Sequence, residues 1–196
     1  RVLGVNGNVN EYALSSSGKE VAFVHRGEVF VTSVAEGTTR RITSTPSQER
    51  SVTWSKDGKT LYYAGERDGG WNLYAVTLAH PEEERVFYRA TEFVERALLA
   101  TPAVEFQPEP SPDGRYVAYV KERDSIEVLE LATGTTRTLA PSKLIYSYED
   151  GDVSLAWSPD SRRLCAARVD DSPVQRWYIA DPANPDRPAL AHPYPA

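Results

Sequence analysis

Three histidines, one cysteine and many serines are the residues most able to do covalent or acid–base chemistry in this sequence. His25, His80 and His192 stand far apart along the chain. A serine hydrolase elbow reads Gly-x-Ser-x-Gly, and the nearest string, Gly151-Asp152-Val153-Ser154-Leu155, lacks the second glycine. Sequence spacing assembles no Ser/His/Asp triad, although adjacency in space is invisible from sequence. We therefore expect no catalytic residue in this segment.

Metal and redox chemistry have little support in the sequence. Cys165 lies in the apolar run Leu164 to Ala167, which predicts an inert thiol in the core rather than a nucleophile. A zinc site needs clustered cysteines and histidines, which are dispersed here. The acidic turn Glu149 to Asp152 could hold a calcium ion, but it lacks the alternating ligands of a calcium loop and is better explained as solvated. We expect no metal and no cofactor.

The acidic run Glu82, Glu83 and Glu84 follows Pro81 in a stretch without a clear strand pattern. A solvated surface is the ordinary explanation for such a run of like charges. The stretch from Glu82 to Arg96 also leaves a short helix open. No pattern in this stretch decides by itself whether the three carboxylates bind a ligand.

A repeated turn indicates the elements that must position these residues. Asp57-Gly58 and Asp113-Gly114 suit a tight connection, because Asp bonds its own backbone and Gly accepts a positive φ; Asp160 repeats the pattern with Ser161 in the glycine position. Leu14 to Lys19 is a fourth, more divergent copy of the turn, with Ser17 in the aspartate position. An alternating apolar run follows each turn, at 20–24, 60–64, 116–120 and 163–167. Each turn is therefore predicted to join the first two strands of a β unit.

The spacing of these turns predicts the architecture. Positions 18, 58, 114 and 161 recur at intervals of roughly 40 to 56 residues, and a four-stranded propeller blade needs about 40–50. We expect an all-β fold, a β-propeller segment of about four four-stranded antiparallel blades. Trp54 and Trp157, each ending a first strand, are expected to pack between blades rather than stack on a ligand. The approximate blades are 8–46, 47–90, 104–141 and 151–191, with an insertion at 80–106.

Composition limits the partners. The net charge of −6 and the pI of about 5.2 do not indicate the basic surface with which proteins bind nucleic acid. No apolar run approaches the ~20 residues that span a bilayer. The chain begins at Arg1 and contains no methionine, so we expect an interior piece of a longer protein; the compartment stays open between cytoplasm and periplasm. An unclosed array exposes its end sheets, so further blades, a catalytic domain or a second copy are expected partners.

The repeated phrase also carries a resemblance. Ser-Pro-Asp-Gly followed by an aromatic-rich strand resembles the PD40 or WD40-like propeller repeat of tricorn proteases, TolB and the dipeptidyl peptidase IV group. The ordered set, from Asn10–Ser15 through Phe106–Gly114 to Tyr146–Asp152, is most similar to the second propeller of a tricorn-like peptidase. This resemblance covers roughly Asn8 to Arg168. Val169 to Ala196 is more similar to a dipeptidyl peptidase IV propeller segment.

The resemblance implies a parent serine peptidase whose catalytic domain lies outside this segment. The segment would gate or dock peptides for that domain. Dipeptidyl peptidase IV relatives use paired propeller glutamates to hold the amino terminus of a substrate, which makes Glu82, Glu83 and Glu84 candidate binding residues for a peptide. Two alternatives remain: a stand-alone TolB-like propeller that binds a protein partner, and the propeller domain of a dipeptidyl peptidase IV-type serine peptidase.

Overall fold

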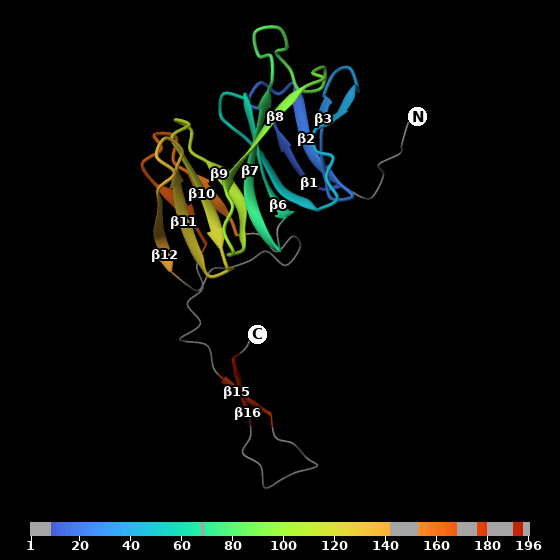
Figure 1. Ribbon diagram of the computed structural model, residues 1–196. Helices are drawn as coiled ribbons and strands as arrows, with labels where there is room; N and C mark the ends of the chain where they lie inside the picture. Colours follow the sequence, from blue (N-terminus) through green and yellow to red (C-terminus); the bar gives the residue numbers. More distant parts are fainter. Residues whose placement is uncertain (1–8, 68, 142–152, 168–175, 180–189, 194–196) are drawn as a thin grey trace.

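Three four-stranded antiparallel sheets follow one another along the chain (Figure 1). The computed structural model describes residues 9–67, 69–141, 153–167, 176–179 and 190–193. Within each sheet, the strands pair in the order of the sequence. The first sheet contains β1 (Val9–Leu14), β2 (Glu20–His25), β3 (Glu28–Ser33) and β4 (Thr39–Arg41); the second β5 (Glu49–Trp54), β6 (Thr60–Arg67), β7 (Gly70–Leu78) and β8 (Phe93–Leu99); the third β9 (Glu105–Pro110), β10 (Tyr116–Lys121), β11 (Ser125–Glu130) and β12 (Thr136–Pro141).

The fourth unit contributes two short strands to the same arrangement. β13 (Leu155–Trp157) pairs with β14 (Leu164–Ala166), and β15 (Arg176–Ile179) pairs with β16 (Leu190–Pro193) in a separate two-stranded sheet. The strands expected to share one sheet over 151–191 are therefore divided between two. No described residue lies in a helix, and so the described part of the chain holds no helix that could cross a lipid bilayer.

Alternation along the strands explains why the sheets stack. On β6, Leu61 and Tyr63 pack with residues of the first sheet, whereas Tyr62 and Ala64 pack with residues of the third. Both faces of the second sheet are thus covered, and β6 reads as a nearly continuous apolar run. A strand buried on both faces loses the apolar–polar alternation that a half-exposed strand keeps.

The first strands of successive sheets lie side by side. β1 contacts β5, β5 contacts β9, and β9 contacts β13, so the sheets radiate from one line of inner strands. This is the arrangement of blades in a β-propeller, and it confirms the all-β prediction. The three four-stranded sheets form an open arc in Figure 1.

The second sheet extends beyond residue 90, the end that the sequence suggested for this unit. Its outer strand β8 (Phe93–Leu99) lies inside the stretch 80–106 that was expected to be an insertion. β8 is the edge strand of its sheet, and Glu95 and Arg96 on it are exposed. Those charges hide the period-2 signal by which a strand is normally found. The second unit is longer than the others because the loop of residues 79–92 joins its strands β7 and β8.

Candidate functional site

A groove of about 800 Å³ lies between the β1–β2 turn, the β5–β6 turn and the loop 79–92. We call it the turn groove. Charged side chains of both signs line it: Lys19, Glu20, Asp57, Lys59, Glu84 and Arg85. Its volume falls in the range of ordinary ligand pockets. The groove is the candidate site because the sequence-predicted turn residues and one of the three candidate glutamates meet there.

The β5–β6 turn is built from local hydrogen bonds. The Ser55 hydroxyl donates to Asp57 Oδ1 at 2.6 Å and accepts the Thr60 N–H at 2.9 Å. Asp57 Oδ1 also accepts the Lys59 N–H at 3.0 Å. Gly58 takes a φ of 70°, a left-handed conformation that costs glycine little. The phrase Ser-x-Asp-Gly therefore encodes its own turn.

The same hydrogen bonds recur in the other copies. Ser111 donates to Asp113, and Ser158 donates to Asp160, at 2.6 Å in both turns. Gly114 has a φ of 70°, and Ser161 takes a φ of 59° in the place of a glycine. In the β1–β2 turn Ser15 and Ser17, 3.1 Å apart, stand where the other turns have Ser and Asp.

The turn aspartates are committed to structure rather than to ligands. The Ser111 hydroxyl and the Arg115 backbone lower the pKa of Asp113 below its ordinary value, and the Ser158 hydroxyl does the same for the pKa of Asp160. Burial opposes ionisation of Asp57, but hydrogen bonds from Ser55 and Lys59 outweigh it and lower its pKa as well. These carboxylates therefore favour the ionised form, and Oδ1 of each is occupied inside the turn.

Aromatic anchors hold the loop 79–92 against the first two sheets. Phe87 is buried with its ring edge-on to Trp54, at a centroid distance of 5.1 Å. The Tyr88 N–H donates to Glu20 Oε1 at 3.2 Å, and the Tyr88 hydroxyl donates to Glu36 Oε1 at 3.2 Å. Sequence reasoning missed these anchors; two adjacent aromatics after an acidic run were the available signal.

The loop separates the three candidate glutamates. Glu82 and Glu83 are exposed and do not line the turn groove, whereas Glu84 is half-buried in its wall. Glu84 Oε1 accepts the Thr91 N–H at 3.2 Å. Glu84 Oε2 is buried and has no hydrogen-bond partner among the described residues. Of the acidic run, Glu84 is thus the member whose side chain lines the groove, with Oε1 engaged and Oε2 enclosed by the protein.

Glu20 forms a second acidic point in the turn groove. Its side chain is buried, and burial raises its pKa although the backbone N–H groups of Tyr88 and Phe87 act in the opposite direction. The two backbone donors thus offset the desolvation of this carboxyl group only in part.

Two tryptophans connect neighbouring sheets near the turns. Trp54 at the end of β5 donates its indole N–H to Ala13 O in β1 at 3.0 Å. Trp157 at the end of β13 donates to Glu109 O in β9 at 2.9 Å. Each indole therefore crosses from its own sheet to the preceding one, and neither residue lines the hollows described here.

The histidines and the cysteine lie apart. His25 is buried on β2 beside Phe30, and His80 Nε2 lies 3.3 Å from Glu92 Oε2 in the loop. Cys165 is exposed, so the expectation of a core thiol is wrong: β14 belongs to a two-stranded sheet, which leaves this side chain at the surface. The acidic turn 149–152 falls outside the described residues. Among those described, no three potential ligands converge to hold a metal ion.

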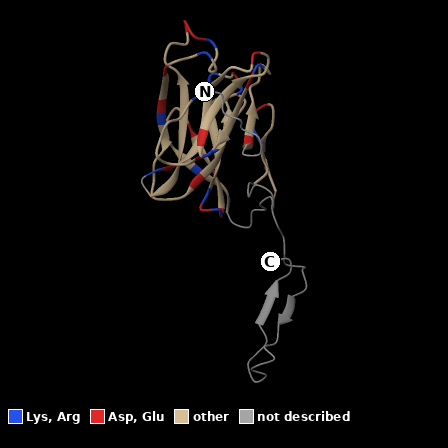
Figure 2. Ribbon diagram, turned by 90° about the vertical axis from the view of Figure 1, so that its right-hand side faces the viewer, with Lys and Arg blue, Asp and Glu red and all other residues tan. Residues whose placement is uncertain are grey.

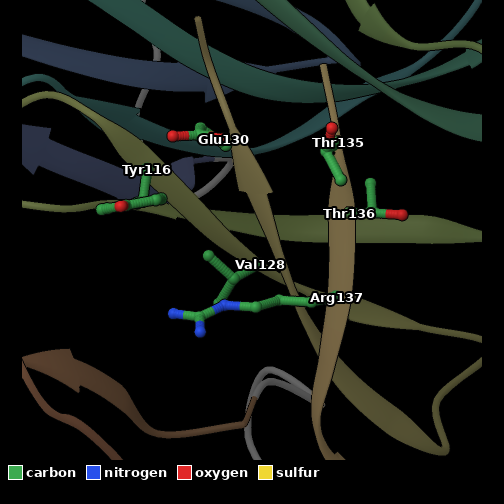
Figure 3. A pocket seen from close by; sticks show the side chains of 6 residues that line it. All are labelled: Tyr116, Val128, Glu130, Thr135, Thr136 and Arg137. Carbon is green, nitrogen blue, oxygen red and sulfur yellow. The ribbon is translucent and has the colours of Figure 1, made fainter. Parts of the chain in front are cut away.

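A smaller hollow of about 210 Å³ lies on the outer half of the third sheet (Figure 3). Val128 of β11 and Arg137 of β12 are cross-strand neighbours in it, and Tyr116 stacks on Trp157 with centroids 6.4 Å apart. Figure 2 shows acidic and basic positions interspersed over the sheets and loops. The turn groove is larger than this hollow and holds charged side chains of both signs.

Comparison with known proteins gives one family and a common fold. A model of the dipeptidyl peptidase IV N-terminal region matches residues 95–196. TolB from Acinetobacter baumannii is 17% identical with a TM-score of 0.55, over 86% of this chain and 44% of TolB. A putative TolB from Agrobacterium tumefaciens is 16% identical with a TM-score of 0.58, over 90% of this chain and 67% of the other.

A third solved structure is of the same kind. The propeller domain of Cps50 (Swd1) from Myceliophteria thermophila is 12% identical with a TM-score of 0.59, over 97% of this chain and 60% of that one. At such identities the likeness shows the fold alone, a β-propeller. The chain spans less than half of the first of these proteins. No curated protein sequence matches it.

Proposed function

Because this chain belongs to the family of the dipeptidyl peptidase IV N-terminal region, whose model covers just over half of it, we propose that it is a non-catalytic propeller of a serine peptidase. It docks peptides for a catalytic domain located elsewhere in the parent protein. The repeat motifs resemble tricorn-like propellers, while the family match favours a parent of the dipeptidyl peptidase IV type. In a parent protein of either type, this segment would dock peptides for the catalytic domain.

The turn groove is the observation that carries this proposal. Its volume of about 800 Å³ accommodates a few peptide residues, and the half-buried Glu84 side chain forms part of its wall. A peptide amino terminus would pair with the Glu84 carboxylate through a charge-assisted hydrogen bond once this side chain turns toward the groove. Lys19 and Lys59 on the opposite turns would face the carbonyl or carboxylate groups of the same peptide.

Replacing Glu84 tests the proposal. For Glu84→Gln we expect binding of a peptide with a free amino terminus to weaken about tenfold, since a charge-assisted hydrogen bond exceeds a neutral one by roughly 1–2 kcal/mol. Isothermal titration calorimetry with the free peptide and its amino-terminally acetylated form measures the difference. Glu82→Gln, exposed on the same loop and outside the groove, is the matched control. Equal affinity of wild type and Glu84→Gln for the free peptide would contradict the proposal.

A second candidate function is a TolB-like propeller that binds a protein partner. It is favoured by Tyr12 and Leu14 on β1, which are 75% and 59% exposed on the outer face of the first sheet. Apolar side chains exposed together mark interaction surfaces. A partner captured by wild type but lost with Leu14→Lys, with no peptide binding in the groove, would favour this second function over the first.

A further inference from the structure

Each copy of the repeated turn carries a cationic residue two places after the aspartate position, and Lys59 and Arg115 hold this place in the second and third sheets. Arg115 Nε lies 2.9 Å from Asp113 Oδ2. Lys59 interacts with the Asp57 carboxylate through its charge as well as through its backbone N–H. In both turns the cation therefore has a carboxylate of its own turn as a partner.

The β1–β2 turn lacks this carboxylate, because Ser17 occupies the aspartate position. Ser17 Oγ accepts the Lys19 N–H at 3.3 Å, as the aspartate of the second turn accepts the corresponding N–H. The turn thus keeps the hydrogen bond of the other copies but loses their negative charge. The Lys19 side chain is exposed and lines the turn groove. Among the residues that the structure describes, Lys19 forms no ion pair.

Arg85 is a second cation of the turn groove without a carboxylate partner. It is exposed on the loop 79–92 and belongs to the groove lining. Arg89, four residues later in the same loop, pairs with Glu36 Oε1 at 2.5 Å outside the groove. Within the described part of the chain, Arg85 has no such ion pair. Two cations from different elements thus line one hollow.

The acidic side chains of the groove interact with other parts of the protein. Glu20 is buried, and its Oε1 accepts the Tyr88 N–H at 3.2 Å. Asp57 Oδ1 accepts hydrogen bonds inside its own turn. Glu84 Oε1 accepts the Thr91 N–H at 3.2 Å, and its Oε2 is enclosed by the protein. The charges of the groove that remain available to a ligand are therefore mainly positive.

The lining of the groove suits a carboxylate that is part of a peptide. Ammonium and guanidinium groups form charge-assisted hydrogen bonds with carboxylates. The ion pair inside the third turn shows that a carboxylate fits beside the cation at the position of Lys19. Ser16 adds a hydroxyl group to the lining, and Leu78 and Val86 add apolar surface for the rest of a peptide.

We propose that the turn groove selects peptides that carry a carboxylate, which binds at Lys19 and Arg85 in place of the aspartate that the β1–β2 turn lacks. The inference rests on the proposed function, since it names the class of peptide that docks in the same groove. The carboxylate belongs to an acidic side chain or to the carboxyl terminus of the peptide. The peptide ammonium group then meets Glu84, so that both charges of the ligand have an opposite charge in the groove.

The test compares tetrapeptides by isothermal titration calorimetry. The first probe is Ala-Ala-Glu-Ala with an amidated carboxyl terminus, and the second has glutamine in place of glutamate. We expect the glutamate peptide to bind about tenfold more tightly than the glutamine peptide, since hydrogen bonds to charged groups exceed neutral ones. High salt should reduce this difference. A third probe, the glutamine peptide with a free carboxyl terminus, distinguishes the two sources of the carboxylate: tight binding supports the terminus, and weak binding supports the side chain.

The same titrations separate this inference from the proposed function. Equal binding of all three peptides overturns the inference and leaves peptide docking in place. Equal binding of the glutamate peptide and its amino-terminally acetylated form, with the preference for glutamate retained, contradicts the contact with Glu84 alone. The absence of binding by every peptide contradicts both the docking of peptides and the selection of a carboxylate.

Two variants of Ser17 separate ligand selection from folding. Ser17→Asp restores the carboxylate of the other turns beside Lys19, so it should abolish the preference for glutamate with the thermal midpoint unchanged or higher. Ser17→Asn adds no charge and should keep the preference. Lys19→Gln should reduce the preference at least threefold, whereas Lys56→Gln, exposed in the β5–β6 turn outside the groove lining, should not. A folded Ser17→Asp that retains the wild-type preference overturns the proposal.

Discussion

Glu109 is a carboxyl group on β9 whose chemistry depends on where the strand lies. It stands between Pro108 and Pro110, and its backbone oxygen accepts the indole N–H of Trp157. Burial alone raises its pKa to about 7, from an ordinary 4.5. The folded state therefore binds the proton of this group more tightly than the unfolded chain does. Stability from this residue is greatest below pH 4.5 and is lost as the pH rises toward 7.

Glu109→Gln should remove this pH dependence. We expect the variant to be more stable than wild type by up to about 3 kcal/mol at pH 8, and the difference to shrink toward pH 4.5. Urea unfolding at several pH values measures it. Glu82→Gln, exposed on the loop 79–92, is the control for loss of a carboxylate at the surface. A difference that stays constant with pH would show that Glu109 is ionised normally in the folded protein.

At the scale of the element, the repeated turn is a self-contained unit of hydrogen bonds. Gly58 and Gly114 share a φ of 70°, and no heavy atom lies within 4 Å of a Cβ built on Gly114. Substitution at Gly114 therefore costs backbone strain without a steric clash. Ser161 accepts the strain at a φ of 59° and uses its hydroxyl to accept the Asp113 N–H at 3.0 Å, which links the third turn to the fourth.

Gly114→Ala should lower the free energy of unfolding by about 1 kcal/mol, the usual cost of a left-handed conformation for a residue with Cβ. Chemical denaturation checks this value. Gly114→Asn is the matched variant, because Asn tolerates positive φ better, and it should cost less than Ala. If both substitutions proved equally harmful, side-chain size rather than backbone conformation would be responsible.

At the scale of the whole molecule, the second sheet is the centre of stability. Its β6 and β7 carry Leu61, Tyr63 and Leu73, which are fully buried between the first and third sheets. Stacked units gain most of their stability from contacts with their neighbours. A sheet covered on both faces is therefore more stable than one at the end of the described arc.

Hydrogen exchange should reveal this order. We expect the amides of β6 and β7 to exchange slowest and those of β13 and β14 fastest among the strands of the arc, because the latter pair has three residues in each strand. Mass spectrometry of deuterated peptides resolves the four units. Uniform protection across them would show that the described sheets unfold as one cooperative body.

The sequence determined the turns, the strand that follows each turn and the stacking of β units, because these depend on chemistry within a few residues. Ser55, Asp57 and Gly58 form their turn from their own hydrogen bonds, and alternation marks the strand beginning at Thr60. The sequence did not predict the edge strand β8, because an exposed edge tolerates charged residues that interrupt the alternation of apolar and polar positions.

Only the tertiary structure decided which side chains face each other across two sheets. It placed Glu84 in the turn groove and its neighbours Glu82 and Glu83 outside, and it set Cys165 at the surface. Arg67 and Arg123 occupy equivalent positions yet meet different partners, because the neighbouring strands differ in sequence. Such contacts join residues far apart in the chain, so no local pattern encodes them.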